Sequence, residues 1–126
     1  MAHVLIVDDD PVVSLTLARM LEWSGHDVSR AATGEAGLAE TQSQPPDAII
    51  LDMRMPAMNG LEFLRRLRAD GHAGLPVGIV TGDYFLGEDV IDELSALGAE
   101  IRYKPVWIDD LTALMERLLT TESLQR

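Results

Sequence analysis

Cysteine is absent from the 126-residue sequence, which excludes disulfides, thiolate zinc sites and a thiol nucleophile. Basic residues are scarce: ten stand against 21 acidic ones, and the net charge of −11 has the wrong sign for binding nucleic acid or an anionic membrane surface. Long hydrophobic runs are also missing, because the first apolar run, residues 4–7, is too short for a signal peptide or a membrane span. We therefore expect a cytoplasmic protein without direct DNA binding, whose chemistry comes from carboxylates, hydroxyls, histidine or lysine.

The hydrophobic residues, 47% of the chain, are sufficient for the core of one compact domain, which we expect to span residues 1–126. Three short apolar runs end in polar or glycine-containing segments, a pattern typical of strands buried on both faces. Two more polar segments complete a set of five predicted strands. In chain order the five are Val4–Val7, Asp27–Ala31, Ala48–Leu51, Val77–Val80 and Glu100–Tyr103.

Segments whose apolar residues repeat at helical spacing separate the strands. Asp10 followed by Pro11 predicts an N-cap and a first helical position, and Gly25 predicts the end of that helix. Asn59, with Glu62 three residues later, predicts another helix start. The remaining helical repeats fall in residues 34–43, 90–97 and 111–118.

The alternation of strands and helices predicts an α/β fold, a doubly wound (βα)5, flavodoxin-like domain with a parallel sheet and helices on both faces. Two predicted strands, 27–31 and 100–103, carry charged side chains and therefore belong at the edges of the sheet. This favours the strand order 2-1-3-4-5. In such a sheet the ligand crevice opens at the carboxyl ends of the first and third strands, where the order reverses.

Residues that suit one phosphoryl site follow four of the predicted strands. Asp8 and Asp9 follow the first strand, Asp52 the third, Thr81 the fourth and Lys104 the fifth. Neighbouring carboxylates repel by about 4 kcal/mol per pair at 4 Å and an effective dielectric of 20, so the acidic cluster needs a cation. Hard oxygen ligands suit Mg²⁺ or Mn²⁺. A phosphoryl group would find metal, ammonium and hydroxyl partners together at this edge of the sheet.

These motifs resemble a response-regulator receiver domain, the phosphoacceptor module of two-component signalling. The resemblance covers residues 3 to about 120 and implies a chemotaxis-regulator-like fold. It implies that Asp52 accepts a phosphoryl group from a histidine kinase or phosphotransfer protein, and that the chain is a switch that catalyses only its own phosphorylation and dephosphorylation. The segments that carry the resemblance are Val4–Pro11, Ile50–Gly60, Val80–Gly82 and Lys104–Pro105.

The same resemblance implies the metal ligands. Asp9 and Asp52 correspond to direct Mg²⁺ ligands, Asp8 to a ligand through water, and Arg54 to the residue that offers its backbone carbonyl. The side chain of Arg54 would flank the mouth of the site together with Asp83, two residues after the predicted fourth strand. We predict that these two side chains form an ion pair that hinders the attacking water and sets the lifetime of the phosphorylated state.

The resemblance also implies how the switch is read. Thr81 corresponds to the hydroxyl that turns toward the phosphoryl oxygens, and Lys104 to the cation that pairs with them, with the Lys104–Pro105 peptide cis. The family often has an aromatic switch residue three positions before the lysine, where this chain has Ile101. Tyr103 lies on the same face of that strand and is a candidate to replace it.

Phosphorylation is then expected to change the face formed by the fourth helix, fifth strand and fifth helix, for an effector, a partner protein or a second copy. Whether the chain is free-standing or part of a longer regulator stays open. One alternative is a haloacid-dehalogenase-type phosphatase with Asp8 as nucleophile and Asp109–Asp110 as a later motif. This alternative leaves Asp52 without a role. Another is a receiver-like interaction module that is never phosphorylated.

Two residue types are assigned to packing. We expect Met53, Met55 and Met58 to fill the loop after the third strand, because a thioether fills irregular gaps more readily than it binds a hard metal. Trp23 and Trp107 are predicted to be partly buried, as amphipathic aromatic residues usually are. For Trp107 we keep the alternative that it belongs to a partner surface.

Overall fold

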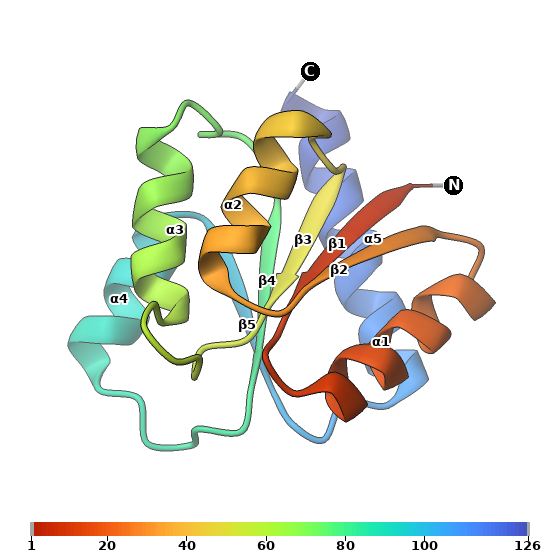
Figure 1. Ribbon diagram of the computed structural model, residues 1–126, viewed down its shortest axis with the longest axis horizontal. Helices are drawn as coiled ribbons and strands as arrows, with labels where there is room; N and C mark the ends of the chain where they lie inside the picture. The colour runs from red at the N-terminus through yellow and green to blue at the C-terminus, as the bar shows by residue number, and fades with distance from the viewer. Residues whose placement is uncertain (1, 126) are drawn as a thin grey trace.

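The computed structural model describes residues 2–125, in which strands and helices alternate strictly (Figure 1). The five strands are parallel and form one sheet in the order β2-β1-β3-β4-β5. The predicted doubly wound α/β fold and its strand order are confirmed. The elements are β1 (His3–Val7), α1 (Pro11–Trp23), β2 (Asp27–Ala31), α2 (Gly34–Ser43), β3 (Ala48–Leu51), α3 (Gly60–Ala69), β4 (Val77–Thr81), α4 (Glu88–Ala96), β5 (Ala99–Tyr103) and α5 (Ile108–Gln125).

The core lies in two layers, one on each face of the sheet. Helices α1 and α5 cover one face, and α2, α3 and α4 cover the other (Figure 1). Successive strand residues point to opposite faces, so Leu5 packs with Phe63 under α3 while Ile6 packs with Leu17 and Leu114 under α1 and α5. No helix within residues 2–125 combines the length and the hydropathy that a membrane crossing requires.

The charged strands β2 and β5 lie at the two edges, as their sequences predict. The three central strands are almost fully buried, whereas most residues of β2 and β5 are half-buried or exposed. In the register of β1 and β3, Val7 pairs with Leu51. The next residue of each strand, Asp8 and Asp52, therefore leaves the sheet at the same edge.

Helix ends follow the predicted capping residues. The Asp10 carboxylate accepts hydrogen bonds from the backbone N–H groups of Val12 and Val13 at 2.9 and 3.2 Å. The Asn59 side chain accepts one from the N–H of Glu62 at 2.9 Å. Gly25 follows α1 with a φ of +94°, a conformation that favours glycine. The Asp10 and Asn59 caps start α1 and α3 directly after the loops that carry the acidic residues.

The burial prediction is right for the methionines and wrong for the tryptophans. Met53, Met55 and Met58 are buried in the loop between β3 and α3. Trp23 and Trp107 are 85% and 66% exposed. Trp23 is the last residue of α1, beyond the final core position of that helix, and Trp107 immediately precedes α5, so neither ring is turned to the core.

Arg68 of α3 joins three backbone segments. Its Nε donates to the carbonyl of Leu97 at 2.9 Å, and its Nη1 donates to the carbonyls of His72 and Leu75 at 2.6 and 2.7 Å. We expect Arg68→Ala to lower the free energy of unfolding by about 2 to 3 kcal/mol, because hydrogen bonds from a charged donor are lost at three acceptors. Urea denaturation checks this. Arg66→Ala is the matched control, since Arg66 makes only an exposed ion pair, worth less than about 1 kcal/mol. Equal losses for both variants would contradict the assignment.

Candidate functional site

Three carboxylates meet at the carboxyl edge of the sheet. Asp8, Asp9 and Asp52 each offer one oxygen within 4.8 Å of the others. Asp8 and Asp52 are buried and Asp9 is exposed. Backbone hydrogen bonds fix the two buried residues, since the N–H of Asp52 donates to the carbonyl of Val7 at 2.9 Å and the N–H of Asp8 donates to that of Ala31 at 3.1 Å. The strand ends therefore hold the cluster in place.

Lys104 lies beside the two buried carboxylates. Its Nζ is 3.5 Å from Oδ2 of Asp8 and 3.4 Å from Oδ1 of Asp52. One ammonium group faces three carboxylates, so the site keeps an excess of negative charge. Oxygen donors with excess negative charge suit a small divalent cation such as Mg²⁺. The residues present thus fit the cation that the sequence predicts.

Burial and charge act on Asp52 in opposite directions. Its desolvation raises the pKa of this carboxyl above the ordinary value of 3.8, and the neighbouring Asp8 raises it further. Lys104 lowers the same pKa by its charge and its hydrogen bond. The net shift is upward, which means that the folded protein binds a proton at Asp52 more readily than the unfolded chain does.

This shift predicts how stability depends on pH without metal. As the pH rises above 3.8, Asp52 loses its proton at a cost to the folded state, so its contribution to stability falls. We expect Asp52→Asn to have a free energy of unfolding about 1 to 4 kcal/mol higher than the parent at neutral pH in EDTA, because the substitution relieves repulsion between neighbouring carboxylates. Thermal unfolding measures this as a Tm about 4 °C or more higher. The difference should vanish at pH values below 3.8, and an unchanged Tm at neutral pH would contradict the prediction.

Thr81 ends β4 beside the cluster, and its hydroxyl is fully buried. The N–H of Asp83 donates to Oγ1 of Thr81 at 3.0 Å, and the N–H of Lys104 donates to its carbonyl at 2.8 Å. The predicted ion pair between Arg54 and Asp83 is present, with Nε 2.7 Å from Oδ2. The N–H of Phe85 and then Arg54 hold the pKa of Asp83 below its usual range. The loop after β4 is therefore tied both to Thr81 and to the loop after β3.

The sequence-based prediction misses Tyr84. Its O–H donates to the backbone carbonyl of Lys104, and its ring stacks on Tyr103 with centroids 5.6 Å apart. Ile101, at the family's aromatic position, packs against the core instead. The predicted cis peptide before Pro105 is confirmed. The register of β4 with β5, in which Thr81 pairs with Tyr103, and the conformation of the loop after β4 together bring the two tyrosines into contact. The sequence reveals neither.

Gly60 allows a close approach behind the phosphoacceptor candidate. A Cβ atom at this position would lie 3.0 Å from the carbonyl oxygen of Asp52 and 3.0 Å from the Cα of Met53. Both contacts are to backbone, which cannot turn away as a flexible side chain can. Glycine at the start of α3 therefore keeps the loop after β3 tight against its helix.

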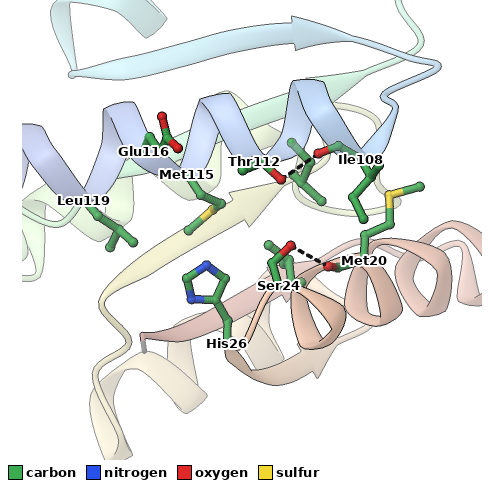
Figure 2. A pocket seen from close by; sticks show the side chains of 10 residues that line it. Met20, Ser24, His26, Ile108, Thr112, Met115, Glu116 and Leu119 are labelled. Atoms are coloured by element: carbon green, nitrogen blue, oxygen red, sulfur yellow. Dashed lines mark hydrogen bonds between the residues drawn. The ribbon is translucent and has the colours of Figure 1, made fainter.

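A separate cavity between α1 and α5, of about 240 Å³, offers no comparable chemistry (Figure 2). Its two hydroxyls bond within their own helices: Ser24 donates to the carbonyl of Met20 at 3.1 Å and Thr112 to that of Ile108 at 2.8 Å. The remaining lining is mostly apolar. The cavity therefore belongs to the packing of α1 against α5.

The second acidic motif considered for a phosphatase does not join the cluster. Asp109 and Asp110 are exposed in the first turn of α5. Oδ2 of Asp110 accepts a hydrogen bond from the N–H of Trp107 at 3.1 Å, as a residue at a helix start does. A haloacid-dehalogenase-type arrangement is not built from these residues.

A doubly wound parallel sheet, with an acidic cluster and a lysine at its topological switch point, defines the class of protein. Residues 4–116 match the family model of the response regulator receiver domain. The chain belongs to this family, and it is a receiver domain of the two-component type.

Individual proteins and solved structures that resemble the chain support the same family assignment. The chain is 34% identical over 116 residues to "Probable transcriptional regulatory protein TcrX" of Mycobacterium tuberculosis, covering 92% of this chain and 49% of that protein. It is 37% identical over 117 residues to the response regulator MprA of Mycolicibacterium vanbaalenii, covering 93% and 50%. The structure of Vibrio cholerae chemotaxis protein CheY4 has a TM-score of 0.86 and 31% identity, covering 94% of this chain and 99% of that one. The chain spans about half the length of the curated relatives it matches.

Proposed function

We propose that the chain is a phosphoaspartate switch in which Asp52 accepts a phosphoryl group from a histidine kinase or a phosphotransfer protein, with Mg²⁺ or Mn²⁺ bound. The observation that carries the proposal is the position of the Asp52 carboxylate, in contact with Lys104 and clustered with Asp8 and Asp9. The match to receiver domains supports the same assignment.

In the proposed reaction an oxygen of Asp52 attacks the phosphorus of the donor's phosphohistidine. A P–O bond forms while the P–N bond breaks, and the histidine nitrogen leaves with the electron pair. Lys104, already 3.4 Å from Oδ1 of Asp52, neutralises charge on the transferred oxygens. Asp8, Asp9 and Asp52, with the backbone carbonyl of Arg54, would hold the cation, which supplies further charge neutralisation.

The output is proposed to start at Thr81. Its hydroxyl now accepts from the N–H of Asp83 and keeps its own O–H to donate. When the hydroxyl turns toward a phosphoryl oxygen, this contact with the loop before α4 changes and the loop rearranges. Leu94 is the one buried residue of α4, so this helix is held to the core by a small contact and can adopt a second position. Moving such an equilibrium from about 1:99 to 99:1 requires about 5.5 kcal/mol. We propose that the face of α4, β5 and α5 reports this change to an effector, in the same chain or in another protein.

The direct test is phosphorylation followed by localisation of the group. The chain is incubated with acetyl phosphate and Mg²⁺, and peptide mass spectrometry identifies the modified residue. We expect Asp52 to be modified when Mg²⁺ is present, and not to be modified when EDTA is added before acetyl phosphate. Modification of Asp8 would favour the phosphatase alternative, and no modification at all would favour the interaction module that is never phosphorylated.

The ion pair between Arg54 and Asp83 predicts the lifetime of the phosphorylated state. Because the pair flanks the mouth of the site, we expect Arg54→Ala to admit water and to speed dephosphorylation by about threefold to tenfold. Loss of the phosphoryl mass after removal of acetyl phosphate measures the rate. Asp83→Asn should act in the same direction, and Arg66→Ala, a distant arginine in an exposed ion pair, should have no effect. An unchanged lifetime in Arg54→Ala would rule out the shielding role.

A further inference from the structure

Helices α3 and α4 lie side by side on one face of the sheet (Figure 1). Each of them connects one parallel strand to the next, so the two helices run in the same direction. Two arginines of α3, about one turn apart, contact two residues of α4 with the same spacing. Arg65 bonds to Glu93, and Arg68 bonds to Leu97. The two contacts therefore form a polar row along the boundary between the helices.

The C-terminal end of α4 is fixed. Nε of the half-buried Arg68 donates to the carbonyl of Leu97 at 2.9 Å. The N–H of Gly98, which has a φ of +86°, donates to the carbonyl of Ser95 at 2.9 Å. Leu97 and Gly98 alone separate the helix from β5, which begins at Ala99. This end of the helix therefore cannot move far without moving the sheet.

The N-terminal end of α4 is held by fewer contacts. It follows the loop 82–87, and the residue before the helix is a glycine without a side-chain hydrogen bond. The first-turn residues Glu88 and Asp89 are exposed and form no salt bridge within residues 2–125. At 1.5 Å per residue, Glu88 is about 14 Å from Leu97 along the axis and Glu93 about 6 Å. A swing about the C-terminal end therefore moves the first turn most.

Arg65 and Glu93 join the two helices between these ends. Nε of Arg65 is 2.5 Å from Oε2 of Glu93, and Nη2 is 2.6 Å from Oε1, so the pair forms two N–H···O bonds. The hydrogen bonds from Arg65 lower the pKa of Glu93, which keeps this carboxylate ionised. Exposed ion pairs usually contribute little, but a bidentate arginine–carboxylate pair is the geometry in which they contribute measurably.

We propose that the Arg65–Glu93 ion pair is a latch that holds α4 in the position described here, with the contact of Arg68 and Leu97 as the pivot. The inference rests on the proposed function, in which the loop before α4 rearranges on phosphorylation. A phosphoryl group at Asp52 that favours the displaced helix must break the latch. By reciprocity, the latch weakens the binding of that group by the same factor.

Hydrogen exchange tests the latch itself, without a phosphoryl donor. We expect Arg65→Ala and Glu93→Ala each to speed exchange of the α4 amides about twofold to fivefold, with exchange in α1 unchanged. Alanine is a strong helix former, so neither substitution weakens its own helix. Arg66→Ala is the matched control and should change nothing in α4, because Arg66 pairs with Glu35 of α2. Salt at about 1 M should speed α4 exchange in the parent but not in Arg65→Ala.

Beryllofluoride with Mg²⁺ tests the coupling to the site, because beryllofluoride takes the place of a phosphoryl group on a carboxylate oxygen. We expect Arg65→Ala to lower its apparent dissociation constant about twofold to fivefold in an NMR titration, by release of the latch. The exchanged pair, Arg65→Glu with Glu93→Arg, forms the ion pair again with the charges reversed. It should therefore restore both the affinity and the exchange rates of the parent.

Three results would overturn the latch: unchanged α4 exchange in Arg65→Ala, an equal effect in Arg66→Ala, and an exchanged pair that behaves like the single variants. Faster exchange with unchanged beryllofluoride affinity would overturn its coupling to Asp52. If the parent itself binds no beryllofluoride, the proposed phosphoryl site is wrong, while hydrogen exchange still decides whether the latch exists. Failure of the proposed function and failure of this inference are thus distinguishable.

Discussion

Asp52→Asn is expected to take up no measurable phosphoryl group from acetyl phosphate, a loss of at least about 1,000-fold in rate, because a neutral amide is a poor nucleophile toward phosphorus. Asparagine has nearly the size and shape of aspartate, so the tight loop between β3 and α3 is kept. The same substitution removes one of the three clustered carboxylates. We therefore also expect weaker Mg²⁺ binding in isothermal titration calorimetry.

The matched control for this result is Asp10→Asn. It removes one negative charge next to the cluster, but asparagine caps a helix as well as aspartate does, so α1 should be unaffected. Asp10 lies outside the group of carboxylates that share the site. Phosphoryl uptake near the parental rate in Asp52→Asn, or an equal loss in Asp10→Asn, would contradict the assignment of Asp52.

That the candidate site residues lie close together could be predicted, because their proximity depends on the topology of the sheet alone. In a parallel sheet all strands deliver their next residue to the same edge, so Asp8, Asp52, Thr81 and Lys104 meet once the strand order is known. That order could be inferred from polarity, since charged side chains in β2 and β5 are tolerated only at the edges. No side-chain geometry was needed for either step.

What could not be predicted depends on pairs that are distant in sequence and lack a repeating pattern. Arg68 has the sequence context of an ordinary surface arginine of α3, yet its acceptors include the carbonyl of Leu97, 29 residues away. The contact of Tyr84 with Tyr103 needs both the register of β4 with β5 and the conformation of the loop after β4. The exposure of Trp23 depends on where α1 ends, and helical periodicity gives helix ends only to within a residue or two.

The missed tyrosine changes how the switch is interpreted. At the position where the resemblance leads us to expect an aromatic residue, Ile101 is partly buried and packs against the core. Tyr84 is three residues after Thr81 and donates to the backbone carbonyl of Lys104, so it links the loop after β4 to the residue that follows β5. We therefore expect any aromatic coupling in this chain to involve Tyr84 in the loop after β4 instead of residue 101.

Lys104→Ala is expected to slow phosphorylation by acetyl phosphate about 100-fold, the typical effect of removing one group that stabilises charge in a transition state. The ammonium is 3.4 and 3.5 Å from Asp52 and Asp8, and it also competes with a metal ion for these carboxylates. Mg²⁺ binding should therefore strengthen in Lys104→Ala while the reaction slows. Calorimetry and the rate of mass increase measure the two effects separately. Parallel losses of metal affinity and rate would instead indicate that the substitution disrupts the site, and Lys104→Arg, which keeps the charge, should retain more of the rate than Lys104→Ala.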